Sequence, residues 1–203
     1  MKIMNSTKDY IRTVLDTIRY DFGDLMVSNI LWVLLMLPII TIPPAFAGLN
    51  YATSQLVHNE SGTRQIFFDG FKRYFRASYS WFFSNVVVVG LLLININFSI
   101  RLPQVLWLQF LRGVYWVLLG SWMLLQIYTF PLLIQQEKPR LFLALRNSAI
   151  LWFKHIIFSL LLSFAIIVLV VVSLYLFPLW FVISASLIGY LANLGVVFLL
   201  SKE

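Results

Sequence analysis

The side chains that could perform chemistry are few in this chain of 203 residues. There is no cysteine, so disulfides, thiolate metal sites and a cysteine nucleophile are excluded. The two histidines, His58 and His155, lie far apart in the sequence, which disfavours a metal site built on them. No Walker loop, zinc-protease motif or nucleophile elbow occurs. The sequence therefore predicts a protein that is not an enzyme and uses no cofactor.

Polar groups within the apolar runs of the sequence point to helix packing rather than to ion-coupled transport. All eight acidic residues lie outside these runs, whereas proton or sodium coupling usually needs an ionisable group at membrane depth. Gln126 and Asn193 lie inside the apolar runs. Each has two candidate roles, an interhelical hydrogen bond or a contact with a substrate. Ala185 and Gly189 precede Asn193 at four-residue spacing, which favours close helix packing within the chain or in a dimer.

The composition places these residues in a membrane. Hydrophobic residues make up 61% of the chain and charged residues 11%, against roughly 25% charge in soluble domains. Residues 79–98, 113–134, 156–177 and 179–200 form runs long enough to cross a hydrocarbon core about 30 Å thick. We therefore predict one all-α, polytopic integral membrane domain spanning residues 1–203, with four full crossings.

The first apolar run, residues 25–42, is broken by prolines. The stretch before Pro38 is too short for a full crossing. Pro43 and Pro44 suit the first turn of a new helix, and Thr41 is placed to cap it. Residues 25–57 are therefore predicted to form either a re-entrant pair of short helices or a single kinked crossing.

The distribution of basic residues favours the re-entrant pair, because Lys and Arg concentrate on the cytoplasmic side. If the first run turns back, every Lys and Arg except Arg101 and Arg112 falls on one side. If it crosses, the two sides are nearly balanced. The favoured topology places the amino and carboxyl termini, residues 50–78 and residues 135–155 in the cytoplasm.

Two segments outside the runs have amphipathic patterns. Within residues 1–24, a helix beginning after Ser6 is predicted, with Ser6 and Asp9 arranged as a capping box. Residues 67–78 form the second segment, for which a helical wheel places basic residues beside an aromatic arc. The basic residues are Lys72, Arg73 and Arg76, and the arc contains Phe67, Phe68, Phe71, Tyr74, Phe75 and Tyr79.

This second segment has three candidate roles. It contacts anionic lipid headgroups through the basic residues and Phe68, Phe71 and Phe75. Alternatively, it is a plain cytoplasmic linker helix or a docking surface for another protein. The net charge of +7 arises from basic residues beside the apolar runs. This placement favours the lipid bilayer over nucleic acid as partner.

Several stretches resemble the YesL-like family of bacterial membrane proteins, a family with a domain of unknown function. They are NILWVLLMLPIITIPPAFAGL (29–49), FFDGFKRYFRASYSW (67–81), YTFPLLIQ (128–135) and ALRNSAILWFKH (144–155), in the order expected for the family. Pro43, Phe46 and Tyr74 depart from the usual Gly, Thr and Asn. The resemblance implies several helices in the bacterial cytoplasmic membrane and gene neighbourhoods devoted to carbohydrate uptake. It implies no established activity.

Two functions remain open from the sequence. The first is a non-catalytic accessory or regulatory protein that assists a carbohydrate uptake system, with transporter subunits as partners. The second is a small transporter that forms a homo-oligomer, in which the broken first helix lines the path.

Overall fold

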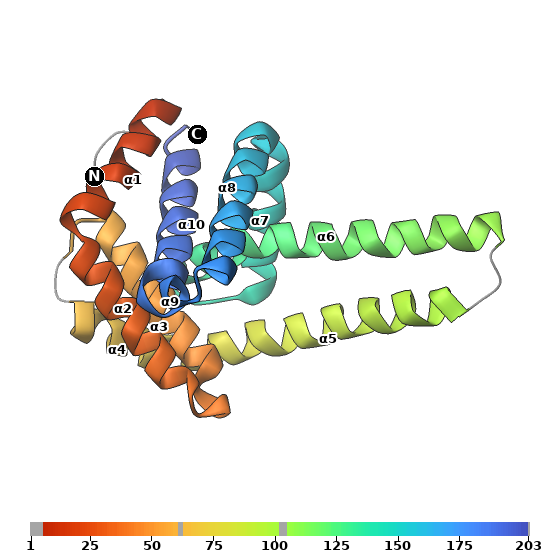
Figure 1. Cartoon of the computed structure of the whole chain (residues 1–203), viewed down its shortest axis with the longest axis horizontal. Coiled ribbons are helices and arrows are strands. Elements are labelled where there is room, and N and C mark those ends of the chain that lie inside the picture. The colour runs from red at the N-terminus through yellow and green to blue at the C-terminus, as the bar shows by residue number, and fades with distance from the viewer. Residues whose placement is uncertain (1–5, 61–62, 102–104, 203) are drawn as a thin grey trace.

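The computed structural model describes residues 6–60, 63–101 and 105–202, and this part of the chain contains helices and no strand (Figure 1). The helices are α1 (Thr7–Tyr20), α2 (Phe22–Met36), the 3₁₀ turn η1 (Ile39–Thr41), α3 (Ile42–Val57), α4 (Thr63–Arg73), α5 (Phe75–Arg101), α6 (Leu106–Ile134), α7 (Leu141–Lys154), α8 (Ile156–Tyr175), α9 (Phe177–Leu179), the π-helix η2 (Trp180–Ser184) and α10 (Ala185–Leu200). By length and composition, α5, α6, α8 and Phe177–Leu200 are able to cross a membrane. The predicted all-α polytopic class is confirmed.

The amino-terminal helix begins as predicted and ends earlier. The backbone N–H of Ser6 donates to Asp9 Oδ2 at 3.0 Å, and the Ser6 hydroxyl accepts from the Lys8 N–H, which completes the capping box. The helix ends at Tyr20 instead of residue 24, because the chain bends at Asp21 and α2 starts at Phe22. Residues 1–5 of the predicted segment lie outside the described residues.

The chain turns back on itself at the prolines of the first apolar run. Helix α2 ends at Met36, Pro38 is extended, and Pro43 and Pro44 occupy the first turn of α3. Thr41 precedes α3, but its side chain does not cap that helix. Its hydroxyl donates backwards to the carbonyl oxygens of Leu35 and Pro38, because α2 leaves its last carbonyls unpaired. Helices α2 and α3 consequently pack side by side.

Helices α5 and α6 form a long hairpin that projects from the rest of the chain (Figure 1). They have 27 and 29 residues, so each extends beyond the predicted ranges of 79–98 and 113–134. Large apolar side chains are exposed along both helices, including Phe83, Leu91 and Trp116. The hairpin runs at a steep angle to α8 and α10 in the same view. Its outer part therefore has only lipid or another chain to cover it.

The core forms around α10, which contacts α1, α2, α3, α6 and α8. The Tyr10 hydroxyl of α1 donates to the Leu191 carbonyl at 3.0 Å. The hydroxyls of Thr17 and Tyr190 lie 2.8 Å apart, and both residues are buried. The last helix is thus the packing centre for the amino-terminal third of the chain.

The amphipathic segment predicted over 67–78 is divided between two helices. Helix α4 ends at Arg73 and α5 begins at Phe75, with Tyr74 between them. Two members of the predicted aromatic arc, Phe67 and Tyr74, are 0% and 2% exposed and belong to the core. Only the other side of the arc, with Phe68 and Phe75, is exposed. Because α4 packs on α3, the rings of Phe67 and Tyr74 lie in the core. The arc therefore does not form one surface that faces lipid.

Candidate functional site

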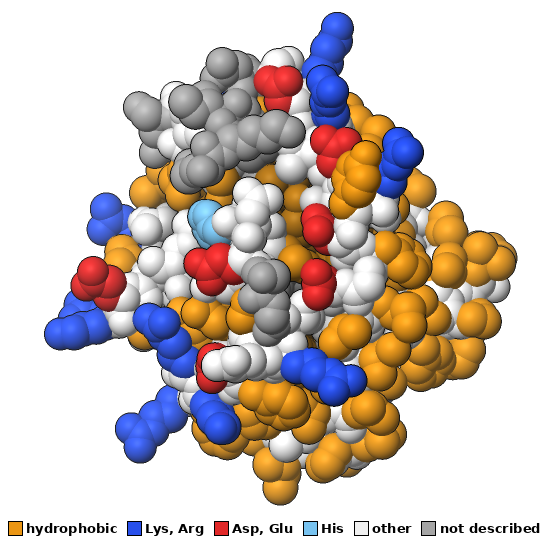
Figure 2. Space-filling model, turned by 90° about the vertical axis from the view of Figure 1, so that its left-hand side faces the viewer, with side chains coloured by type: hydrophobic (Ala, Val, Ile, Leu, Met, Phe, Trp, Pro, Cys, Tyr) orange, Lys and Arg blue, Asp and Glu red, His pale blue; other side chains and the backbone are white. Residues whose placement is uncertain are grey.

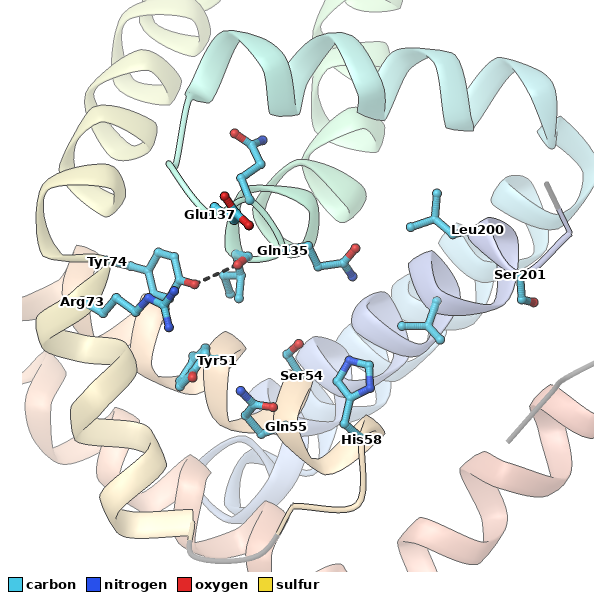
Figure 3. Close-up of a pocket in the computed structure, with 13 residues that line it drawn as sticks. Tyr51, Ser54, Gln55, His58, Arg73, Tyr74, Gln135, Glu137, Leu200 and Ser201 are labelled. Atoms are coloured by element: carbon cyan, nitrogen blue, oxygen red, sulfur yellow. Dashed lines mark hydrogen bonds between the residues drawn. The ribbon is translucent and has the colours of Figure 1, made fainter. Parts of the chain in front are cut away.

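A polar cleft of about 510 Å³ opens where the carboxyl-terminal ends of α3, α6 and α10 meet the junction of α4 and α5 (Figure 3). The residues that line this polar cleft are Tyr51, Ser54, Gln55, His58, Arg73, Tyr74, Ile134, Gln135, Gln136, Glu137, Val197, Leu200 and Ser201. The carboxyl-terminal end of a helix carries partial negative charge. Three such ends, together with the Glu137 side chain, favour a ligand that donates hydrogen bonds.

Tyr74 fixes one wall of the polar cleft. Its hydroxyl donates to the Ile134 carbonyl at 2.8 Å, which ties the start of α5 to the end of α6 (Figure 3). Burial raises the pKa of Tyr74, Arg73 opposes this shift, and Tyr51 adds to it. The Arg73 guanidinium lies 5.5 Å from the centre of the Tyr74 ring. Tyr74 therefore stays protonated and keeps donating at neutral pH.

The predicted basic cluster lies at the edge of the polar cleft. Arg73 lines the cleft, Lys72 and Arg76 do not, and all three are exposed. The neighbouring Phe68 and Phe75 are about 40% exposed, and Phe71 is half-buried. The cluster is thus accessible to lipid headgroups, and Arg73 is also available to a ligand in the cleft.

Gln126 takes part in a polar network between α5 and α6. Its Oε1 accepts from Trp81 Nε1 at 2.9 Å and lies 3.5 Å from Asn85 Nδ2. Asn85 Oδ1 in turn accepts from Trp122 Nε1 at 3.0 Å. The structure therefore places Gln126 as an interhelical acceptor within the hairpin.

Asn193 and the small residues before it face α3 and its neighbours. Asn193 Nδ2 lies 3.2 Å from both the Asn50 carbonyl and Thr53 Oγ1. A Cβ added at Gly189 would lie 3.0 Å from Thr53 Oγ1, so α10 and α3 approach closely at this point. Ala185 is buried in the smaller apolar cluster around Trp32. This face is therefore occupied by packing within the chain.

Asn29 holds an irregular segment of the last apolar run, and sequence reasoning gave it no such role. Its Nδ2 donates to the carbonyls of Trp180 and Phe181 at 3.0 and 2.7 Å. Its Oδ1 accepts from the Ser186 N–H at 3.0 Å. These bonds span the π-helix η2, whose wider turn disrupts ordinary helical pairing. The only sign of this role in the sequence is that Asn29 is a polar amide residue within an apolar run.

The polar cleft itself was not predicted. Its residues come from four segments far apart in the sequence, and no motif unites them. Within the described ranges, no three His, Asp or Glu side chains lie close enough to hold a metal ion. The polar cleft presents hydroxyl, amide, imidazole, carboxylate and guanidinium groups to a ligand.

Comparison with known proteins yields one match. Residues 25–96 match the model of a protein family of unknown function, DUF624. The matched range runs from α2 through the proline break, α3 and α4 into α5, and so includes the first half of the polar cleft. Neither the curated proteins nor the solved structures contain a match.

Proposed function

We propose that this chain is a non-catalytic accessory or regulatory protein of the bacterial cytoplasmic membrane, and that the polar cleft holds a segment of a larger membrane system. The observation that carries the proposal is the cleft, an open, amide-rich hollow bounded by three helix carboxyl-terminal ends. The occupant is a polar segment rich in N–H or O–H donors. The YesL-like resemblance of the sequence favours subunits of a carbohydrate importer as the source of that segment.

The proposed topology places the polar cleft in the cytoplasm. The segments around the cleft are ones that the distribution of Lys and Arg assigns to the cytoplasmic side. Figure 2 shows a face on which basic and acidic side chains gather, and this face lies opposite the tip of the α5–α6 hairpin. Arg101 ends α5 near that tip, and Arg112 there donates to the Ser99 carbonyl at 2.6 Å.

Single cysteines introduced into this cysteine-free chain test the topology. The exposed positions Ser6, Glu60 and Ser201 are expected to be protected from an impermeant maleimide added outside intact cells, while Val105 reacts. All four cysteines should react once the membrane is opened. Opposite accessibility of Ser6→Cys and Glu60→Cys would show that the α2–α3 pair crosses the membrane.

Crosslinking tests the proposed function. A photoreactive amino acid at Gln55, in the polar cleft, should capture importer subunits in native membranes that express the importer. The same amino acid at Phe83, which is exposed on the hairpin, serves as the matched control and should capture lipid. Copurification in mild detergent should recover the same subunits and lose them in the Glu137→Lys variant, because a cation in the cleft repels a donor-rich segment. Capture of lipid alone at both positions would refute the accessory function.

The second part of the proposal is contact between the exposed basic residues and anionic lipid. Lys72 and Arg76 each contribute about 1 kcal/mol near an anionic surface, so removing both charges should weaken attachment roughly thirtyfold, and reversing them should weaken it further. Hydrogen exchange of residues 67–78 should be slower in anionic than in neutral nanodiscs, and Lys72→Glu with Arg76→Glu should abolish the difference. Arg101→Glu, at the hairpin tip, is the control. Equal exchange in both lipids for the unmodified chain would exclude this contact.

One observation favours a second function, a small oligomeric transporter. Trp32 from α2, and Phe46 and Asn50 from α3, line a cavity inside the bundle, so the broken first helix borders an internal space. Flux of a sugar into proteoliposomes that contain only this protein would support transport. Recovery of flux only in the presence of importer subunits would support the accessory function instead.

A further inference from the structure

The bundle cavity, a partly enclosed space of about 240 Å³, lies among α2, α3, α6, α8, η2 and α10. Its lining residues are Trp32, Phe46, Asn50, Gln126, Ile127, Phe130, Pro131, Ile166, Trp180, Ala185, Ile188, Gly189 and Ala192. Nearly all of them present apolar surface, and none of them is ionisable at neutral pH. A charged ligand would therefore find no countercharge there.

Two hydrogen-bond donors among these lining residues have no partner among the described residues. Trp32 is only 7% exposed, and its Nε1–H is unpaired. Gln126 Nε2 is likewise buried and unpaired. An indole N–H can only donate, so the bond from Trp81 fixes which end of the Gln126 amide is the oxygen. The unpaired group of Gln126 is therefore its Nε2 donor.

Unpaired buried donors are costly, and a ligand with an acceptor would remove that cost. A dry apolar cavity of about 150 Å³ is large enough for benzene. The bundle cavity therefore has room for a two-ring or medium-chain molecule. Both nitrogens are closed to solvent-sized groups in this structure, so an acceptor bound in the cavity requires a small shift of the side chain that donates to it.

We propose that the bundle cavity binds a neutral, largely apolar molecule whose single carbonyl or ether oxygen accepts a hydrogen bond from the more deeply buried of these donors, the Trp32 indole N–H. This binding is independent of the polar cleft and of its occupant. The ester end of a membrane lipid and a free lipophilic carbonyl compound both have the required chemistry.

A pair of probes that differ only in the acceptor tests the proposal. 2-Acetylnaphthalene has the carbonyl oxygen, and 2-isopropenylnaphthalene has a CH₂ group in its place. Calorimetry in detergent micelles should show the ketone binding about tenfold more tightly, as expected for one hydrogen bond. Partitioning of a probe into micelles is common to all protein variants, so it cancels when variants are compared.

The Trp32→Phe variant removes the N–H and keeps an aromatic ring. It should lower ketone affinity about tenfold and leave the affinity for the hydrocarbon unchanged. Trp122→Phe is the matched control, because that indole bonds to Asn85 and does not line the bundle cavity. Ala185→Leu should fill the bundle cavity and weaken binding of both probes. If that variant does not fold, the Trp32→Phe comparison still decides.

Repeating the titration in phospholipid nanodiscs separates the two ligand sources. Loss of ketone binding in nanodiscs, with retention in micelles, identifies membrane lipid as the competing occupant. Retention in both identifies a free lipophilic molecule as the ligand. Equal affinity for the two probes, or an equal loss in the Trp32→Phe and Trp122→Phe variants, would overturn the proposal.

Discussion

Replacing Asn29 with leucine is expected to lower the free energy of unfolding by about 2–4 kcal/mol. The change removes three hydrogen bonds, two partly buried ones to the π-helix η2 and one buried one to Ser186. Single bonds of this kind in membrane proteins contribute about 0.6–1.7 kcal/mol. The loss should fall on one segment, because all three partners lie within Trp180–Ser186.

Titration with a denaturing detergent measures the stability of the Asn29 variant. The matched control is Asn95→Leu, since Asn95 is exposed on α5 and donates only to the Leu91 carbonyl of its own helix. The control should unfold within about 0.5 kcal/mol of the unmodified chain. Equal stability of the two variants would mean that the π-helix does not depend on the Asn29 amide.

The second large effect is expected at Gly70, where α4 crosses α3. A Cβ added at this position would lie 2.4 Å from the Tyr51 Cβ, so the two helices would have to separate. Overpacking of this kind costs about 1–3 kcal/mol. Gly70→Ala should therefore lower the melting temperature, even though alanine favours a helix by about 1 kcal/mol.

Gly90→Ala gives the opposite expectation and serves as the matched control. Nothing lies within 4 Å of a Cβ added at Gly90, which is on the projecting part of α5. The substitution should leave the melting temperature unchanged or raise it slightly. Since Tyr51 lines the polar cleft, Gly70→Ala should also weaken crosslinking from Gln55. A Gly70 variant as stable as the Gly90 variant would contradict the close α3–α4 contact.

The sequence predicted those features that depend on local chemistry. Long apolar runs predicted the helices able to span a membrane, because a helix satisfies all its backbone hydrogen bonds within one continuous apolar segment. Pro43 and Pro44 predicted the start of a helix, since proline is compatible with the first turn. Ser6 and Asp9 predicted the cap of α1.

The features that were missed depend on tertiary contacts. No proline or glycine marks the break between α4 and α5 at Tyr74. The hydroxyl of this buried residue donates to a carbonyl 60 residues away in the sequence. Helix α7 was not predicted, because its mostly apolar sequence of 14 residues is too short for a crossing, and it packs on α6. Threonine is a common helix-capping residue, so Thr41 was predicted to cap α3. Only the fold shows that its hydroxyl bonds to carbonyls that precede it in the chain. The polar cleft requires four segments to meet, which no local pattern encodes.

The central position of α10 has a consequence for how the chain is made. Synthesis proceeds from the amino terminus, so Tyr10, Thr17 and Asn29 leave the ribosome long before their partners in residues 180–191 exist. During that interval these polar groups have no native partners in the chain. A nascent chain that stops before Phe177 never acquires them, whereas the α5–α6 hairpin is already complete. Quality control can therefore distinguish such a chain from the complete protein. Its α5–α6 hairpin is present, but its amino-terminal third lacks the packing against α10.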